Sequence, residues 1–185
     1  MIVNSEYTIS IKNELLPSDI QKGNWLVIMY AKRIPPHIGV FINGKYSSLT
    51  IKGHEINVDS NVIFKIIQQK KTETLFVKLL NHPVFSYDFQ REAFLQYLMQ
   101  FPYVEHYVAT CLSPIKLYLQ EFYAIPLIEN ELLFELIERL KQNNYIENIY
   151  SLNLPETITE KNFQFNTYTN EQLQNEIKHI RTTNS

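Results

Sequence analysis

The sequence predicts an α+β fold in which a small antiparallel, partly barrel-like sheet from residues 1–80 packs against helices from residues 85–145. Three observations favour this fold class. Short apolar runs separated by turn residues fill the first part of the chain, as is typical of antiparallel strands. All four glycines lie there too, where sharp turns and close backbone approaches are expected. Beyond it, apolar residues recur at helical spacing.

The predicted strands follow one another closely along the chain. Residues 2–11 alternate loosely, which predicts a strand or an extended arm. Residues 25–30 form a continuous apolar run, WLVIMY, as expected of a strand buried on both faces. The next strand covers His37–Ile42, and Asn43-Gly44 predicts a type I′ hairpin because both central residues of that turn take positive φ angles. The return strand covers Tyr46–Ile51. Further strands are expected at residues 56–58 and 75–80.

Cap residues mark the helices. Asp59 and Ser60 precede an amphipathic segment at residues 61–70. Thr110 is a natural N-cap, and Pro114 costs little in the first turn because the amides there have no intrahelical acceptor. The other helices are expected at residues 89–101, 111–123 and 129–143.

The chain is long enough for one compact domain, which we expect to cover residues 1–150. Residues 151–185 are rich in Asn, Thr, Gln and Glu, which predicts a polar C-terminal extension. A short helix is expected at residues 171–181. The extension either packs on the domain or is loosely ordered.

Composition and charge exclude several classes of function. The formal net charge of −2 gives no electrostatic basis for binding nucleic acid or an anionic membrane. The single cysteine excludes an internal disulfide framework and a thiolate zinc site. No apolar run is long enough to span a bilayer, and the N-terminus lacks the pattern of a secretory signal. We therefore expect a cytoplasmic protein without a cofactor.

His37 and Cys111 form a candidate catalytic pair. A nucleophilic cysteine needs a favoured thiolate, which a helix N-terminus and a neighbouring imidazole both provide. Cys111 lies in the first turn of a predicted helix, and a strand holds His37 rigidly, as a base requires. Gly39 lies inside that strand, where it indicates close approach by another element, and we expect a helix to pack there.

Two segments resemble a known family. HIGVFINGKYSSL, from His37, resembles the His-x-Gly-[Ile/Val]-[Tyr/Phe] strand and hairpin of the NlpC-type papain-like cysteine peptidases. GNWLVIMY resembles the strand that leads into that histidine, with Asn24 where Asp is usual. The only cysteine follows the histidine, as in the circularly permuted branch that includes lecithin:retinol acyltransferase-like enzymes, and YVATCLSPIKLYL resembles the cysteine helix of that branch. The resemblance covers residues 23–49 and 107–119 and implies a permuted papain-like fold.

The third member of the site is open. The family usually carries a polar residue, often His, on the return strand to orient the base. Aligning the turns places Ser47 or Ser48 there. His54 and Glu55 lie further on and serve instead if the strand is bulged. His106, in VEHYVAT, is a spare candidate.

Each candidate also has a structural interpretation. Cys111 is then a small buried hydrophobe, and His37 is a strand-end histidine that bonds a backbone carbonyl. His54 is a turn histidine facing water, and Ser48 is an ordinary strand serine. A metal site from His37, His54 and Glu55 lacks any pair at helical i, i+4 spacing, so no metal is expected.

The resemblance implies a thiol hydrolase or acyltransferase. Cys111 attacks an acyl carbon, His37 takes and returns the proton, and helix N-terminal amides help to hold the oxyanion. The substrate is peptide-like or lipid-like: an amide in a peptide or cell-wall fragment, or a lipid ester. Two rivals are a non-catalytic binding module with the same fold, and a structural or inhibitory protein that binds a partner through its helical, polar C-terminal third.

Overall fold

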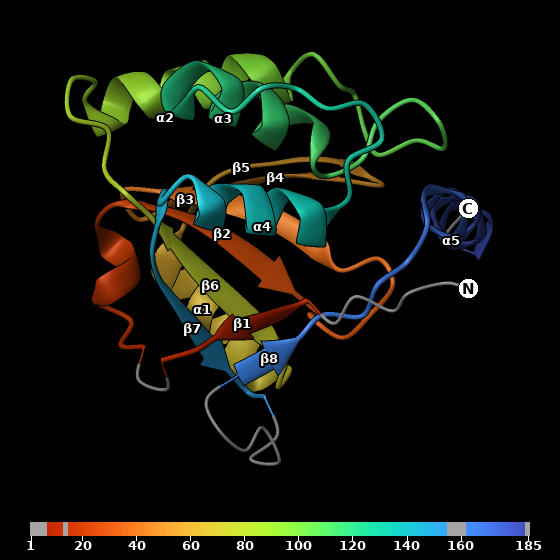
Figure 1. The fold of residues 1–185 in the computed structure, drawn as a ribbon, viewed down its shortest axis with the longest axis horizontal. Coiled ribbons are helices and arrows are strands. Elements are labelled where there is room, and N and C mark those ends of the chain that lie inside the picture. The colour runs from red at the N-terminus through yellow and green to blue at the C-terminus, as the bar shows by residue number, and fades with distance from the viewer. Residues whose placement is uncertain (1–6, 13–14, 155–161, 184–185) are drawn as a thin grey trace.

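Two antiparallel sheets and five α-helices organise the part of the chain that the structure, a computed structural model, describes: residues 7–12, 15–154 and 162–183 (Figure 1). The predicted α+β class is confirmed. The larger sheet packs against helices and is open, with β5 and β7 at its two edges, rather than closed into a barrel.

The larger sheet has six strands in the order β5-β4-β3-β2-β6-β7. Five of them come from the part of the chain predicted to form strands, and β7 extends the sheet beyond it. The strands are β2 (Asn24–Met29), β3 (His37–Ile42), β4 (Lys45–Thr50), β5 (Gly53–Asp59), β6 (Thr74–Leu79) and β7 (Ile146–Leu152).

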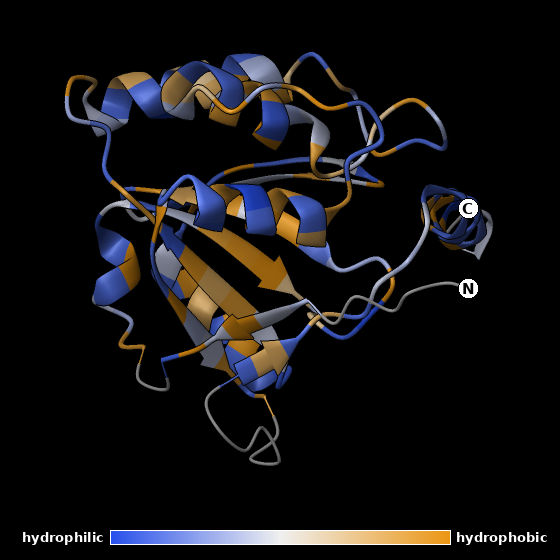
Figure 2. Cartoon of the chain, in the orientation of Figure 1, coloured by the Kyte–Doolittle hydropathy of each residue, from blue (hydrophilic) through white to orange (hydrophobic). Residues whose placement is uncertain are grey.

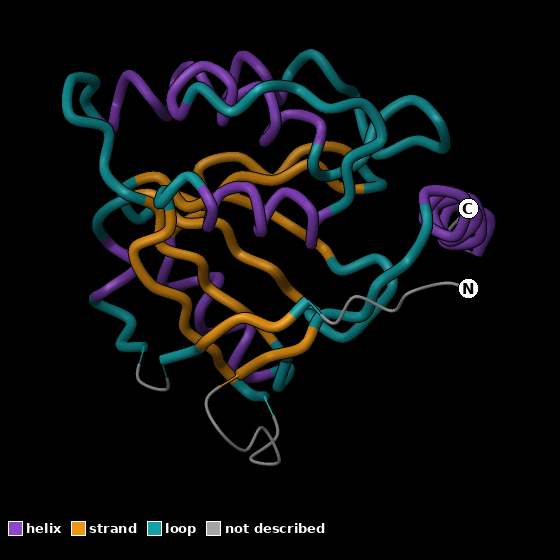
Figure 3. The backbone as a smooth tube through the Cα atoms, in the orientation of Figure 1, coloured by secondary structure: helices purple, strands orange, loops and turns teal. Residues whose placement is uncertain are grey.

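Helices cover both faces of this sheet (Figures 1 and 3). On one face lies α1 (Ser60–Gln69), and on the other lie α2 (Tyr87–Leu98), α3 (Ser113–Tyr123) and α4 (Leu133–Gln142). The continuous apolar run of β2 is therefore buried on both sides, as predicted, and Figure 2 shows these apolar strands between the helices. None of the helices in the described segments has the length and apolarity needed to cross a membrane.

Local sequence signals explain the elements around β3. Asn43 and Gly44 take φ angles of 49° and 78°, as the predicted hairpin turn requires. Asp59 caps α1, and its side chain accepts a hydrogen bond from the Asn61 amide. Ser86 caps α2 in the same way through the amide of Phe89.

The C-terminal part of the chain packs on the rest. β8 (Asn162–Gln164) pairs with β1 (Thr8–Ser10) in a separate two-stranded sheet, so the predicted N-terminal strand has its partner there. α5 (Asn170–Thr183) covers the predicted short helix and extends beyond it at both ends. Of the two alternatives for this part of the chain, packing is correct for its described residues. The buried side chains that join the main core are Phe163, Phe165, Tyr168, Leu173 and Ile177.

Candidate active site

A cavity of about 670 Å³ opens at the end of the large sheet where β2 finishes and β3 begins, and both His37 and Cys111 line it. Glu55 on β5 is a further polar group on its wall. α1 and α5 close it from two sides. The apolar part of the wall includes Met29, Ile34, Ile51, Ile63, Val104 and Ile177.

His37 is a mostly buried imidazole with a hydroxyl partner. Its Nε2 atom lies 3.3 Å from the hydroxyl oxygen of Tyr46 on the next strand. Burial lowers the pKa of His37 below its ordinary value of 6.5, and the negative charge of Glu55 partly opposes that shift. The imidazole is therefore neutral at pH 7 and has one nitrogen available to accept a proton.

The element that approaches Gly39 is the Tyr46 side chain, so the expectation of a helix at this position is wrong. A Cβ atom on Gly39 would overlap the Tyr46 ring. The hairpin register explains the contact: Tyr46 lies opposite Phe41, which places it diagonally across from Gly39. Only glycine leaves room for the ring to lie on the strand and bring its hydroxyl to His37.

Ser48 bonds Glu55 rather than the imidazole. It donates a hydrogen bond of 2.7 Å to Glu55 Oε2. β5 is bulged against β4 near Asn57, which has a φ of 51°. Because of this bulge, Glu55 is the residue of β5 that pairs with Ser48.

His54 is not brought to the cavity. It pairs with Leu49, and its Nε2 lies 2.6 Å from the carbonyl oxygen of Phe101, so it has neither the orienting role nor the water-facing role predicted for it. His106 stacks edge-on against Tyr107 and is also outside the cavity lining.

Cys111 lies just before α3, which begins at Ser113. Thr110 stabilises the turn that leads into the helix: its hydroxyl accepts from the Leu112 amide at 3.2 Å, and its own amide donates to the Ser113 hydroxyl at 2.9 Å. The helix begins two residues after Cys111 and its N-cap position is Leu112, which makes no side-chain cap bond, so the predicted cap at Thr110 is wrong.

Cys111 is partly buried and packs against the apolar main core. Burial raises its pKa to about 11, although the amides of Ile38, Leu112 and Cys111 itself act in the opposite direction. The expectation of a thiolate favoured by the helix N-terminus is therefore wrong for the resting protein. The amides stabilise negative charge on sulfur, but the loss of water outweighs them.

Cys111 and His37 reach the cavity from different faces of the sheet. Cys111 packs against the core beneath α2, α3 and α4, whereas alternation along β3 places His37 on the face of Phe41 and Tyr46, which α1 covers. The β3–β4 ladder ends at Val40, so the strands are unpaired near the start of β3. The amide of Ile38, the residue next to His37, acts there to lower the pKa of the thiol.

No cluster of three metal-ligating side chains exists among the described residues, and His37, His54 and Glu55 do not converge. The chain matches no family model, no curated protein and no solved structure. The site is therefore defined by the geometry of this protein alone.

Sequence reasoning missed Tyr46, which contacts the imidazole directly. A signal for it was present. The Asn43-Gly44 turn fixes the hairpin register, and a large aromatic residue diagonal to a strand glycine is a common way to cover that glycine.

Proposed function

We propose that the protein is a thiol-dependent hydrolase or acyltransferase of the permuted papain-like type, with Cys111 as nucleophile and His37 as base. The observation that carries this proposal is that one cavity is lined by both groups. The substrate class is an acyl compound, either an amide of a peptide or cell-wall fragment or a lipid ester. The mainly apolar cavity wall suits its acyl part.

The resting pair is neutral, because the pKa of His37 is lowered and the pKa of Cys111 is raised to about 11. His37 therefore acts as a general base in the attack. The thiol proton passes to the imidazole while sulfur bonds to the acyl carbon, and His37 then returns that proton to the leaving amine or alcohol as its bond to carbon breaks. Water or an acceptor alcohol releases the acyl group from sulfur.

Acylation of Cys111 by p-nitrophenyl butyrate, followed by intact-mass spectrometry, tests the proposal. We expect one butyryl adduct, absent in Cys111→Ala and formed at least about 100-fold more slowly in His37→Asn, which is the usual contribution of general-base catalysis. His106→Asn removes a histidine outside the cavity and is expected to react like the wild type. The rate should rise with pH through the lowered pKa of His37 and reach a plateau near neutrality.

The raised pKa of Cys111 favours one alternative, a binding module that keeps the cavity without catalysis. In that case butyryl transfer to Cys111 is no faster in the wild type than in His37→Asn. That result would overturn the enzyme proposal, whereas a fast adduct that depends on His37 would exclude the binding module.

A further inference from the structure

The cavity that His37 and Cys111 line is apolar inside and cationic at its opening along α1. Ile63, Ile66 and Lys70 share one face of α1 because they lie at helical spacing, and all three line the cavity. Ile63 is 6% exposed, Ile66 is 40% exposed, and Lys70 at the end of the helix is exposed. An apolar wall therefore leads outward to a positive charge.

A second cation, Arg33, lines the cavity from the loop between β2 and β3. Its guanidinium carbon lies 4.0 Å from the centre of the Tyr30 ring, a contact that supports the group but offers its N–H donors no oxygen acceptor. This loop is bonded to the segment after Lys70, because the Ala31 amide donates to the Glu73 carbonyl at 3.0 Å. The two cations therefore lie on neighbouring segments at the opening.

Arg33 and Lys70 have no carboxylate partner among the residues that the structure describes, since neither takes part in an ion pair there. The adjacent Lys32 differs, because it pairs with Glu73 at 3.7 Å and does not line the cavity. Two cations without such a partner beside an apolar wall favour a ligand that is itself anionic.

The carboxylates of the cavity lining come from other elements. Glu55 on β5 accepts the hydrogen bond from Ser48, and Glu176 is an exposed residue of α5. The lining therefore carries its positive charges at the end of α1 and on the β2–β3 loop, and its negative charges on β5 and α5. A single anionic group is attracted to the first side only.

We propose that the cavity binds a single-chain amphipathic anion, whose apolar chain lies along the isoleucines of α1 and whose head group lies between Arg33 and Lys70. A cavity of about 670 Å³ is in the usual size range for a small-molecule site. The chain covers Ile66 and also Ile34 at the opening, which is 37% exposed. The head group is a carboxylate or a phosphate, because both accept hydrogen bonds from Arg and Lys.

The use of this ligand as a substrate rests on the function proposed above, whereas its binding does not. Such a substrate is an amide or ester that joins the acyl chain to an anionic leaving group. The acyl carbon connects these two parts and is the atom that Cys111 attacks. His37 then returns the proton to the amine or alcohol that bears the anionic group.

Isothermal titration calorimetry with a matched pair of amides tests the binding. N-dodecanoylglycine carries a carboxylate, and N-dodecanoylethanolamine has the same chain and amide with a neutral hydroxyl. Both are titrated below their critical micelle concentrations into the full chain with Cys111→Ala, so that they stay intact. We expect the anion to bind at least about tenfold more tightly, as one charge-assisted hydrogen bond provides. Dodecyl phosphate, titrated in the same way, distinguishes a phosphate from a carboxylate head group, and tight binding of either anion supports the proposal.

Arg33→Gln and Lys70→Gln should each weaken binding of the preferred anion about tenfold and leave binding of the neutral amide unchanged. Lys32→Gln is the matched control, because it removes the same charge from an adjacent residue outside the lining, and it should leave both affinities unchanged. Equal affinities for the anions and the neutral amide, a loss of the same size in Lys32→Gln, or no binding of any of these ligands would overturn the inference.

The two proposals fail separately. Tight binding of the anion by a protein whose Cys111 forms no butyryl adduct counts against the proposed function alone. Butyryl transfer that depends on His37, without any preference for the anion, counts against this inference alone.

Discussion

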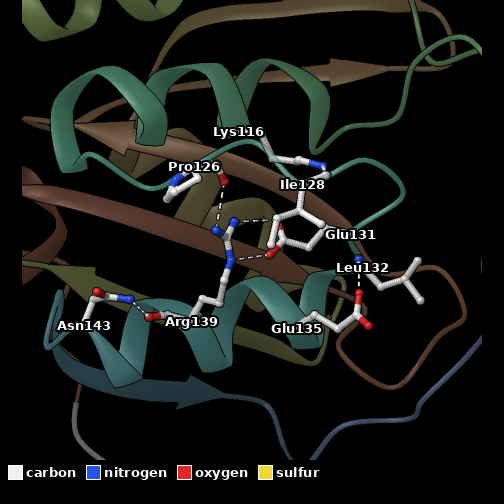
Figure 4. Close-up of polar contacts among 8 residues, drawn as sticks. All are labelled: Lys116, Pro126, Ile128, Glu131, Leu132, Glu135, Arg139 and Asn143. Carbon is white, nitrogen blue, oxygen red and sulfur yellow. Dashed lines mark hydrogen bonds and ion pairs between the residues drawn. The ribbon is translucent and has the colours of Figure 1, made fainter.

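Two polar networks in this protein each depend on a glutamate, and they differ in how they end. Arg139 on α4 bonds both carboxylate oxygens of Glu131, at 2.6 and 2.9 Å, and also the carbonyl oxygen of Pro126 at 2.8 Å (Figure 4). The other consists of two hydrogen bonds beside a cavity: Ser48 donates to Glu55 at 2.7 Å, and the Tyr46 hydroxyl lies 3.3 Å from Nε2 of His37. The first is closed on itself, and the second leaves an imidazole nitrogen free.

The closed network holds a loop in place. Residues 124–132 connect α3 to α4, and further contacts support them: Lys116 donates to the Ile128 carbonyl, and Glu135 accepts from the Leu132 amide at 2.7 Å (Figure 4). Arg139 and Glu131 are paired with each other, and Lys116 and Glu135 are bonded to backbone. The comparison separates two roles: satisfied polar groups stabilise a fold, whereas polar groups beside a cavity are available to a ligand, as the proposed function requires.

Breaking the closed network is expected to have the largest effect on stability. The Glu131 side chain is only 2% exposed and that of Arg139 19%, so Arg139→Met leaves a buried carboxylate without its partner. We expect a loss of about 3 kcal/mol in the free energy of unfolding, measured by urea denaturation. The His37 NMR signals of the folded variant should stay as in the wild type.

Lys141→Met on the same helix is the matched control. Lys141 lies 4.0 Å from Glu138, and their side chains are 56% and 35% exposed. This exposed pair contributes little, so we expect a change below about 0.5 kcal/mol. Adding Glu131→Gln to Arg139→Met should recover part of the loss, because the buried charge is gone. Equal losses in Arg139→Met and Lys141→Met would show that the buried pair does not stabilise the fold.

Gly39→Ala tests the contact between Tyr46 and His37 by changing the packing around it. The added methyl group overlaps the Tyr46 ring, so the ring or the strand has to move. We expect a loss of about 2 kcal/mol on urea denaturation, as is usual for overpacking in a core. The displaced Tyr46 should also disturb the contact between its hydroxyl and His37, and so shift the His37 NMR signals, which Arg139→Met should not do.

A double-mutant cycle isolates this contact. Tyr46→Ala alone should cost about 3 kcal/mol, since a large buried ring is lost. In the Tyr46→Ala background, Gly39→Ala should cost almost nothing, because its methyl group enters the space that the ring has left. Additive losses in the cycle would mean that Gly39 is required for another reason.

Much of the fold was predictable, because its signals are local. The apolar run of β2, the Asn43-Gly44 turn and the Asp59 cap each specify their element from neighbouring residues. β7 was missed because its burial does not alternate cleanly along the strand. The pairing of β1 with β8 joins the two ends of the chain, and no short-range pattern encodes such a contact.

The candidate site was predictable only in part. His37 and Cys111 were recognised from a strand, a glycine and a helix cap, and both line the cavity. The third position stayed open between Ser48, His54 and Glu55, because the choice depends on one bulge near Asn57, and Tyr46 was missed. That bulge brings Glu55 to Ser48 and leaves His54 opposite Leu49. The raised pKa of Cys111 could not be predicted from the sequence either, since burial depends on tertiary packing.

The smallest effect expected is a pH dependence of stability that comes from His37. Its pKa is below 6.5 in the folded protein, because burial disfavours the charged ring, so the unfolded chain binds this proton more readily. The contribution of His37 to stability is therefore present above pH 6.5 and is lost as the pH falls through the lowered pKa of the folded state. His37→Asn should remove this contribution, so the wild type loses more stability than the variant between pH 7.5 and pH 5 in urea denaturation. If both proteins lose the same amount, the imidazole is not the buried, neutral base that the proposed function requires.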